Sequence, residues 1–449
     1  MFLFQATSWV GGRALSELKI NLLDLSMCIS DAVDLVNKAV ANHHRQVAYI
    51  AYCIGGELGL SEEQQSELLL AGALHDIGAL SLKERLYMLN FEVDHPHEHA
   101  AIGYRLLKIF QPFSQIAEII RMHHVAWNNG AGLEFSGKSV PVASHILHLA
   151  DRVAVSIKKD QEILSQADRI CKKIIERSGK MFMPEAVDAF LRLACKESFW
   201  FDLVLKSTGA VLPQILPRNM SQSKAAITPT ITITITLDGA LDLARLFSQI
   251  IDFRSRLTAT HSSGVAASAE ALAKFAGYTS DECKMMKIAG YLHDLGKLAV
   301  PAEILEKPAS LTKAEFQIIR RHPYLTYRIL EAVDELQTIN IWGALHHERM
   351  DGNGYPFHLK GSDLPEGSRI MAVADVFTAI TEDRPYRKGM DEELALKILK
   401  RMVLDSALDG DVVSVLASFF EEINRKRIDA QKLALKVYQE FEDEVRKCA

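Results

Sequence analysis

The chain has 449 residues, of which 48% are hydrophobic and 24% are charged, values typical of soluble globular proteins with two or more domains. The net charge of -6 argues against nucleic acid polymers and anionic membranes as partners, so an anionic ligand would need a local group of cationic side chains. The six cysteines include no C-x-x-C pair, the N-terminus lacks the pattern of a signal peptide, and no run reaches roughly 18 apolar residues. We therefore expect reduced thiols, no membrane span and a cytoplasmic location.

Apolar residues recur at intervals of three and four along most of the chain, which predicts an all-α fold. In the first part, "SEEQQSELLLAGALHD" predicts a helix that starts with a capping box of Ser61 and Gln64 and ends at a His-Asp pair. The Pro-bearing stretch "VLPQILPRNMSQSKAAITP" predicts a linker, and the alternating "TITITITL" at 230–237 predicts a short strand. Beyond it, "SDECKMMKIAGYLHD" predicts a helix that Ser280 caps and that ends at a second His-Asp pair.

These elements divide the chain into three parts. We expect an N-terminal helical domain at 1–207, a linker with a short β segment at 208–237, and a C-terminal helical domain at 238–449. The two bundles are therefore expected in tandem. The charged segment 406–449 is expected to complete the second bundle and to support homodimer contacts.

The two domains repeat the same ordered motifs. "HRQVA" at 44–48 pairs with "HSSGVA" at 261–266, "LHDIGAL" with "LHDLGKL", and "HAAIGYRLL" with "HPYLTYRIL". The third histidine precedes a His-His pair by 24 residues in both halves (99 to 123 and 322 to 346), and an aspartate follows. The first histidine precedes the His-Asp pair by 31 residues (44 to 75) in one half and 32 (261 to 293) in the other. This pattern indicates an internal duplication.

Each half thus contains five histidines and two aspartates that a helical bundle could direct toward one site. Such nitrogen and oxygen ligands suit Fe or Mn, with Ni or Zn as alternatives, and suit Mg or Ca poorly. Seven ligands exceed the needs of one catalytic ion but suit two ions about 3.5–4 Å apart that share a carboxylate, for which Asp294 is placed best. The predicted ligands of the second half are His261, His293, Asp294, His322, His346, His347 and Asp375. The corresponding residues of the first half are His44, His75, Asp76, His99, His123, His124 and Asp151.

This ordered set resembles the HD superfamily of metal-dependent phosphohydrolases, and "HDLGK" with "HHERMDGNGYP" is similar to its HD-GYP branch. The HD-GYP likeness covers about 235–405, while about 20–205 resembles only the general HD helical bundle. The resemblance implies a bacterial signalling phosphodiesterase that opens a cyclic dinucleotide, either cyclic di-GMP or 3',3' cyclic GMP-AMP. A signalling partner protein is an accompanying expectation.

The resemblance also assigns roles to single residues. It divides the second-half ligands into one group for each ion and a bridge between them: His261, His293 and Asp375; His322, His346 and His347; and Asp294. It implies that a hydroxide held between the ions attacks the phosphorus in line. Asp294 and Lys297 are the expected catalytic residues, and Lys297 is also expected to reach a substrate phosphate.

The loop after the second His-His pair and a later arginine pair complete the expected substrate contacts, with Tyr355 either stacking on a base or contacting a partner domain. The predicted contacts are Lys297, Asp351, Gly354, Tyr355, Pro356, Arg384 and Arg387. A purely structural turn is the alternative for the loop, and surface or intramolecular ion pairs are the alternative for the arginines. Glu348 is expected either to orient a ligand histidine or to be solvated.

The sequence departs from the family pattern in both halves. Leu257 stands where some HD-GYP members have a metal-binding glutamate, so we expect two ions in the second half and not three. In the first half, Ala79 replaces the lysine and "VAWNNGAGL" replaces "ERMDGNGYP". We interpret this half first as a regulatory or dimerising relic, second as a metal-loaded sensor, and third as another phosphohydrolase. A nucleotide or dNTP phosphohydrolase and a non-catalytic cyclic dinucleotide receptor are the alternative functions of the whole chain.

Overall fold

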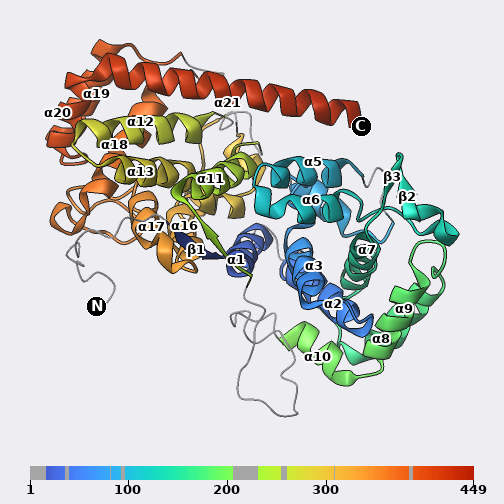
Figure 1. The fold of residues 1–449 in the computed structure, drawn as a ribbon. Helices are drawn as coiled ribbons and strands as arrows, with labels where there is room; N and C mark the ends of the chain where they lie inside the picture. Colours follow the sequence, from blue (N-terminus) through green and yellow to red (C-terminus); the bar gives the residue numbers. More distant parts are fainter. Residues whose placement is uncertain are drawn as a thin grey trace.

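The computed structural model describes residues 17–35, 40–80, 82–92, 97–205, 231–253, 260–307, 309–383 and 388–448. Figure 1 shows two helical bundles side by side, the first coloured blue to green and the second yellow to red. The only sheets in the described ranges are two ribbons of two strands each, so the predicted all-α class is confirmed. In this part of the chain, no helix combines the length and apolar character needed to cross a membrane.

The first bundle contains ten α-helices within the described residues. Its elements are β1 (Leu18–Asn21), α1 (Leu22–Asp34), α2 (His43–Glu57), α3 (Glu62–Leu74), α4 (Leu82–Met88), α5 (His97–Lys108), η1 (Gln111–Phe113), α6 (Ser114–Arg121), η2 (Asn128–Leu133), β2 (Glu134–Phe135), β3 (Lys138–Ser139), α7 (Val142–Val155), α8 (Leu164–Ile175), α9 (Pro184–Ala194) and α10 (Glu197–Leu205).

The second bundle repeats the order of the ligand-bearing helices and adds a long C-terminal helix. Its elements are β4 (Thr232–Ile235), α11 (Leu237–Asp252), α12 (His261–Phe275), α13 (Ser280–Leu292), η4 (Leu295–Ala299), α14 (Ala302–Leu305), α15 (Lys313–Ile319), α16 (His322–Leu330), η5 (Asp334–Leu336), α17 (Gln337–Ala344), η6 (Gly361–Asp363), α18 (Glu366–Thr381), α19 (Glu392–Leu404), α20 (Gly410–Ser418) and α21 (Phe420–Cys448).

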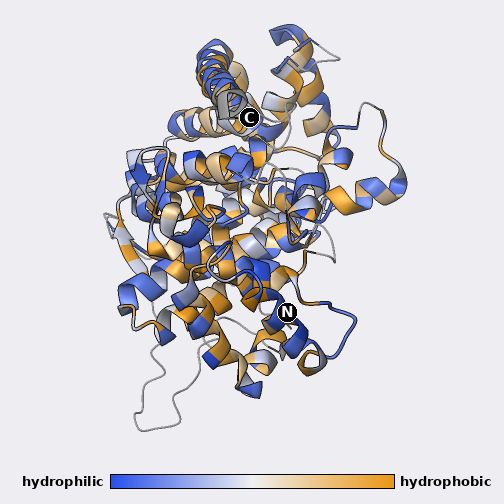
Figure 2. Cartoon of the chain, turned by 90° about the vertical axis from the view of Figure 1, so that its right-hand side faces the viewer, coloured by the Kyte–Doolittle hydropathy of each residue, from blue (hydrophilic) through white to orange (hydrophobic). Residues whose placement is uncertain are grey.

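Apolar side chains on one face of most helices form a continuous core, as the alternation of hydrophobic and hydrophilic positions along the helices suggests (Figure 2). Local capping fixes where two ligand-bearing helices begin. The capping box of Ser61 and Gln64 at α3 is present as predicted. At α13 the predicted cap Ser280 is wrong, because the extended residue Thr279 caps the helix in a box with Glu282, and Ser280 is the first helical residue.

A two-stranded ribbon joins the halves. The predicted strand within 230–237 forms as β4 and pairs antiparallel with β1, which places Leu18 opposite Ile235 and Ile20 opposite Ile233. Each strand leads directly into the first helix of its half, and each of these helices packs on the other half: α1 contacts α16 and η4, and α11 contacts α5. The ribbon therefore lies where the two copies meet, and the part of the predicted linker before residue 231 lies outside the described residues.

Close helix crossings place the ligand-bearing helices in the same way in both copies. A Cβ added to Gly72 on α3 would lie 2.4 Å from the Cα of Ala48 on α2, and a Cβ on Gly290 of α13 would lie 2.5 Å from the Cα of Ala266 on α12. Only glycine permits backbones to approach so closely. The start of α2 or α12 thereby lies beside the end of α3 or α13, where the His-Asp pairs occur.

Candidate metal centres

The second half brings the predicted ligands into two groups. The side chains of His261, at the start of α12, His293, after α13, and Asp375, on α18, offer ligand atoms within 4.8 Å of one another. The Nε2 atom of His261 lies 3.2 Å from Oδ1 of Asp375. The second group meets the same distance criterion and consists of His322, His346 and His347.

Asp294 lies between the two groups and directs one oxygen to each. Its Oδ2 atom lies 3.1 Å from Nε2 of His293 in the first group, and its Oδ1 atom lies 3.2 Å from Nε2 of His322 in the second. The Nε2 atom of His346 is 4.0 Å from the same Oδ1. This is the arrangement that a carboxylate shared by two ions requires.

Backbone carbonyls orient three of the histidines for ligation through Nε2. The Nδ1 atoms of His293, His322 and His346 contact the carbonyl oxygens three residues earlier at 2.7, 2.8 and 2.7 Å. A hydrogen bond of this kind fixes the ring and its tautomer. The buried Nε2 of His293 and Oδ1 of Asp294 have no hydrogen-bond partner, which is costly for polar atoms unless another group, such as a metal ion, contacts them.

The charge states of three of these residues also match those of metal ligands. Burial alone would raise the pKa of Asp294, but His293 and Lys297 hold it well below its usual value, so the carboxylate is ionised. Burial, together with neighbouring histidines, holds the pKa of His346 well below its usual value and lowers that of His347 to about 3. Ionised carboxylates and neutral imidazoles are the forms that bind metal, so Asp294, His346 and His347 are in the forms that suit a divalent transition ion, whereas His261 would lose a proton on binding one.

Glu382 is a functional residue that the sequence analysis missed. Both of its carboxylate oxygens lie 3.2 Å from Nδ1 of His261, on the side of the ring opposite Asp375, and Gln431 on α21 donates to it at 3.0 Å. Although burial opposes protonation, Glu382 and Asp375 raise the pKa of His261 to about 10. In the sequence, Glu382 is one of many acidic residues near the end of a helix, so nothing distinguished it as a partner of His261.

Lys297 lies beside the bridging carboxylate, where its Nζ donates to Oδ2 of Asp294 at 2.5 Å. It remains partly exposed, with 18% of its side chain accessible. Gly296 precedes it, and a Cβ there would lie 2.0 Å from the carbonyl oxygen of His322. The glycine therefore lets the turn after Asp294 contact the helix that carries the next ligand.

The loop after the His-His pair contacts this centre mainly through Tyr355. The Tyr355 ring lies 4.9 Å from the ring of His347, and its N–H donates to the His347 carbonyl at 3.2 Å. The guanidinium of Arg320 lies 4.6 Å from the centre of the Tyr355 ring, a contact that no sequence motif predicted. Tyr355 thus connects an arginine to a candidate ligand histidine.

Other loop residues have clear structural roles. Asp351 pairs with Arg349 at 2.8 Å and accepts the N–H of Asn353 at 2.8 Å, as in a tight polar turn. A Cβ on Gly354 would lie 2.4 Å from the Cα of Glu348, so only glycine fits there. Pro356 follows Tyr355 through a cis peptide bond.

Both expectations for Glu348 are wrong. It is 3% exposed, and its oxygens accept the N–H groups of Phe357 at 2.6 Å, His358 at 3.2 Å and Leu359 at 3.1 Å. Its function is to fix the chain that follows Pro356. Three further positions, Leu257, Arg384 and Arg387, lie outside the described residues.

The first half contains the same two groups, with one correction to the predicted ligands. His43, not His44, lies with His75 and Asp151: its Nε2 is 3.3 Å from Nε2 of His75 and 3.4 Å from Oδ1 of Asp151. His44 instead bonds Asp34 at 2.6 Å through Nδ1. The reason is that α2 begins at His43, as α12 begins at His261.

A spacing signal could have found His43. Residues 43 to 75 and 261 to 293 are both separated by 32 positions, whereas the choice of His44 left a mismatch of one. His44 then corresponds to Ser262, whose hydroxyl donates to Asp252 at 2.8 Å, just as His44 contacts Asp34. The doublet of adjacent histidines made the wrong one easy to choose.

The other predicted ligands of the first half are arranged like their counterparts in the second half. Asp76 directs Oδ2 to His75 and Oδ1 to His99, both at 3.3 Å, and the other group consists of His99, His123 and His124. This centre is more enclosed than the second. All seven of its ligands are buried, whereas His347 in the second centre is partly exposed, with 30% of its side chain accessible.

The groups beside the first centre also differ. Arg152 pairs with Oδ2 of Asp151 at 2.5 Å and donates to the carbonyl of Asn90 at 2.6 Å. Ala79, the counterpart of Lys297, is buried and contributes only a methyl group. In the first centre a cation thus pairs with the ligand Asp151, whereas in the second centre Lys297 pairs with the bridging Asp294.

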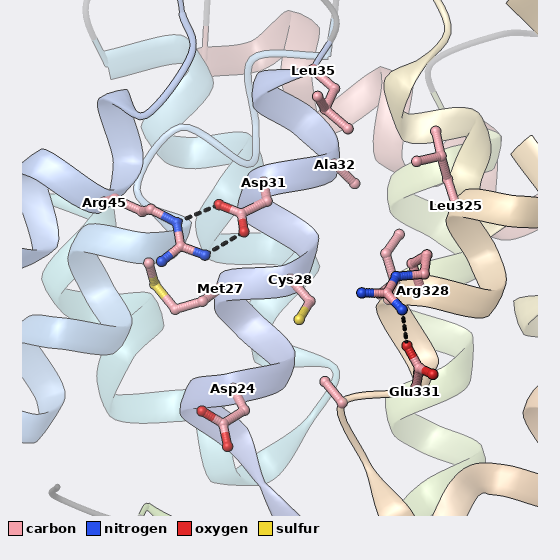
Figure 3. A pocket seen from close by; sticks show the side chains of 12 residues that line it. Asp24, Met27, Cys28, Asp31, Ala32, Leu35, Arg45, Leu325, Arg328 and Glu331 are labelled. Carbon is pink, nitrogen blue, oxygen red and sulfur yellow. Dashed lines mark hydrogen bonds and ion pairs between the residues drawn. The ribbon is translucent and has the colours of Figure 1, made fainter. Parts of the chain in front are cut away.

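A cavity of about 410 Å³ lies away from both centres, between α1 and α16 (Figure 3). Two ion pairs line it, Asp31 with Arg45 on the first half and Arg328 with Glu331 on the second. These four charges neutralise one another in pairs, Asp24 adds a carboxylate, and the cavity marks the junction of the two halves.

Comparisons with known proteins agree with this architecture. Family models described as HD domain match residues 40–156 and 245–412. The 3'3'-cGAMP-specific phosphodiesterase 1 of Vibrio cholerae is 30% identical over 410 residues, which cover 89% of this chain and 92% of that protein. The 3'3'-cGAMP-specific phosphodiesterase 3 of the same organism is 30% identical over 292 residues, 65% of this chain and 60% of that protein.

Two further comparisons concern part of the chain and the fold. A cyclic di-GMP phosphodiesterase of Pseudomonas aeruginosa is 42% identical over 141 residues, 31% of this chain and 34% of that protein. The crystal structure of a cyclic GMP-AMP specific phosphodiesterase of Vibrio cholerae, V-cGAP3, has a TM-score of 0.56 at 21% identity and covers 89% of this chain and 97% of that one. That likeness shows the fold.

Two helical bundles, each with paired His/Asp groups and each matched by a family model, define the class as tandem HD-domain proteins. The match to the 3'3'-cGAMP-specific phosphodiesterase 1, at 30% identity over 89% of this chain, identifies the family within this class. The chain belongs to the HD-GYP family of HD-domain phosphodiesterases.

Proposed function

We propose that the second half hydrolyses a cyclic dinucleotide to the linear dinucleotide at its two-ion centre. The observation that carries this proposal is the position of Asp294, with one oxygen toward each histidine group, at a site that is open beside His347. The names of the relatives support the substrate class, since they specify cyclic GMP-AMP or cyclic di-GMP.

Of the two substrates we favour 3',3' cyclic GMP-AMP. The relative that matches 89% of the chain carries that specificity in its name, whereas relatives named for cyclic di-GMP match about a third of the chain. The proposed ions are Fe or Mn, with Ni or Zn as alternatives, because all accept imidazole and carboxylate ligands.

Different residues of the second half would contribute to different parts of the phosphodiester hydrolysis. Bound metal ions would stabilise negative charge on the phosphoryl oxygens and lower the pKa of a water nucleophile. Asp294 holds the two ligand groups at the separation that this chemistry needs. Glu382 orients His261, and Lys297 places a cation beside Asp294 where phosphate charge would develop.

We infer that the first half holds metal through His43, His75, Asp76, His99, His123, His124 and Asp151 but does not hydrolyse the dinucleotide. Its ligands are buried, and it has alanine in place of Lys297 and a glycine, Gly132, in place of Tyr355. An enclosed set with complete ligation suits a structural or sensing ion better than a catalytic one, which needs an open position.

Hydrolysis of cyclic GMP-AMP, cyclic di-GMP and dNTPs by the metal-loaded full chain tests the proposal. Turnover of a cyclic dinucleotide to its linear form supports it. Turnover of dNTPs alone would favour a nucleotide phosphohydrolase, and tight binding without turnover would favour a receptor; either result contradicts the proposal.

A further inference from the structure

Arg320 presents an uncompensated positive charge beside the second centre. It is the C-cap residue that follows helix α15, it lies two residues before the candidate ligand His322, and it is partly buried. Within the described ranges its guanidinium has no carboxylate partner. Its central carbon lies over the face of the Tyr355 ring, 4.6 Å from the ring centre. A cation–π contact holds an arginine in place without neutralising it, so the charge stays available to an anion.

Through Tyr355, Arg320 lies on the same side of the centre as the partly exposed ligand His347. The Tyr355 ring lies 4.9 Å from His347, and the His347 ring lies 5.1 Å from that of His322. His347 is the most accessible of the seven second-half ligands. The Tyr355 ring therefore contacts both the Arg320 guanidinium and His347, the accessible member of the second ligand group.

We propose that Arg320 binds the phosphate of the cyclic dinucleotide that is not being cleaved, with Tyr355 as its support; this inference rests on the proposed function. A cyclic dinucleotide has two phosphodiesters on opposite sides of its ring. If one lies at the metal ions beside Lys297, the other extends from the site and needs its own cation. A guanidinium suits this role because it can bind two phosphate oxygens at once.

The first half provides an internal comparison. The residue two positions before His99 is His97, whose ring stacks on Phe135 at 5.0 Å. Gly132 follows the first-half His-His pair at the distance at which Tyr355 follows the second. Both the guanidinium and its aromatic support are thus absent from the copy that also lacks the Lys297 side chain. The three differences together remove phosphate recognition from that half.

Steady-state kinetics of Arg320→Ala and Arg320→Lys in the full chain test this role, with Arg321→Ala as the exposed neighbouring control. We expect Arg320→Ala to raise KM for cyclic GMP-AMP by about tenfold or more, the effect of losing one charge-assisted hydrogen bond, and to change kcat by less than about twofold. Arg320→Lys should recover part of the affinity, and Arg321→Ala should behave as the unsubstituted chain.

A second substrate separates recognition from structural damage. Bis(p-nitrophenyl) phosphate has one phosphodiester, so its hydrolysis should be unchanged in Arg320→Ala. An equal loss on both substrates, or an unchanged KM for cyclic GMP-AMP, would overturn the role of Arg320.

Tyr355→Leu should raise the same KM by more than Tyr355→Phe does, because the support is the ring and not the hydroxyl. Matched bound-metal content in every variant shows that the centre is intact. If the unsubstituted chain cleaves bis(p-nitrophenyl) phosphate but neither cyclic dinucleotide, the proposed function itself fails, and the Arg320 assignment fails with it.

Discussion

Asp294 and Glu382 show how single carboxylates organise the second centre. Asp294 contacts both ligand groups, and Glu382 contacts the ring of His261 from the side opposite Asp375. A carboxylate behind a ligand histidine fixes the ring and increases its basicity. The first residue was predictable from its place in a repeated His-Asp motif, whereas the second was not, because only the fold brings residue 382 to residue 261.

The Glu382→Gln variant should bind metal about 10 to 100-fold more weakly while the fold persists, because the amide still accepts a hydrogen bond but carries no charge. Competition with a chelator measures the affinity. Glu335→Gln, at an exposed position, is the matched control. Unchanged metal affinity in Glu382→Gln would show that the carboxylate does not support His261.

His43 and His44 separate ligation from packing in the first half. His43→Ala should reduce the metal content of the full chain, whereas His44→Ala should retain the metal and lower the free energy of unfolding by about 1–3 kcal/mol, because Asp34 loses its buried partner. Elemental analysis and urea unfolding measure the two effects. Metal loss in His44→Ala with retention in His43→Ala would restore the original sequence assignment.

At the scale of elements, local signals predicted more than long-range ones. Periodicity indicated the helices, the Ser61 capping box fixed the start of α3, and Thr-Ile alternation indicated β4. The cap of α13 was misplaced by one residue because Thr279 and Ser280 are both good caps, and backbone conformation decides between them. The partner of β4 was not predicted, since strand pairing depends on the meeting of the two halves.

The crossing of α12 and α13 positions His261 and His293, although it contains no ligand itself. Gly290→Ala should destabilise the chain by about 1–3 kcal/mol and lower its metal affinity, because the new methyl group would lie 2.5 Å from the Ala266 backbone and separate the helices. Urea unfolding and metal competition measure both effects. Gly56→Ala, inside α2 with its nearest neighbour a flexible Gln65 side chain at 3.4 Å, is the control; equal stability of the two variants would contradict this account.

At the scale of the whole molecule, duplication produced two similar centres with different access. The β1–β4 ribbon and the packing of α1 on α16 link the halves, and α16 begins with the ligand His322 (Figure 1). The order and spacing of the histidines made the duplication predictable. The difference in access was not, because it depends on side chains from several helices that surround His124 and His347.

The assignment of catalysis to the second half follows from that difference. Lys297, Tyr355 and Arg320 lie near an accessible ligand group there, whereas Ala79, Gly132 and His97 occupy the corresponding positions of the enclosed copy. The same metal-binding pattern can therefore serve catalysis in one half and structure or sensing in the other.

The most direct test compares double substitutions in the two His-Asp pairs of the full chain, with cyclic GMP-AMP hydrolysis as the readout and bound metal as the check on each centre. His293→Ala with Asp294→Ala should abolish turnover and remove the second-half metal. His75→Ala with Asp76→Ala should remove the first-half metal and leave measurable turnover. Loss of turnover only in the first-half pair, with hydrolysis intact in the second-half pair, would contradict the assignment.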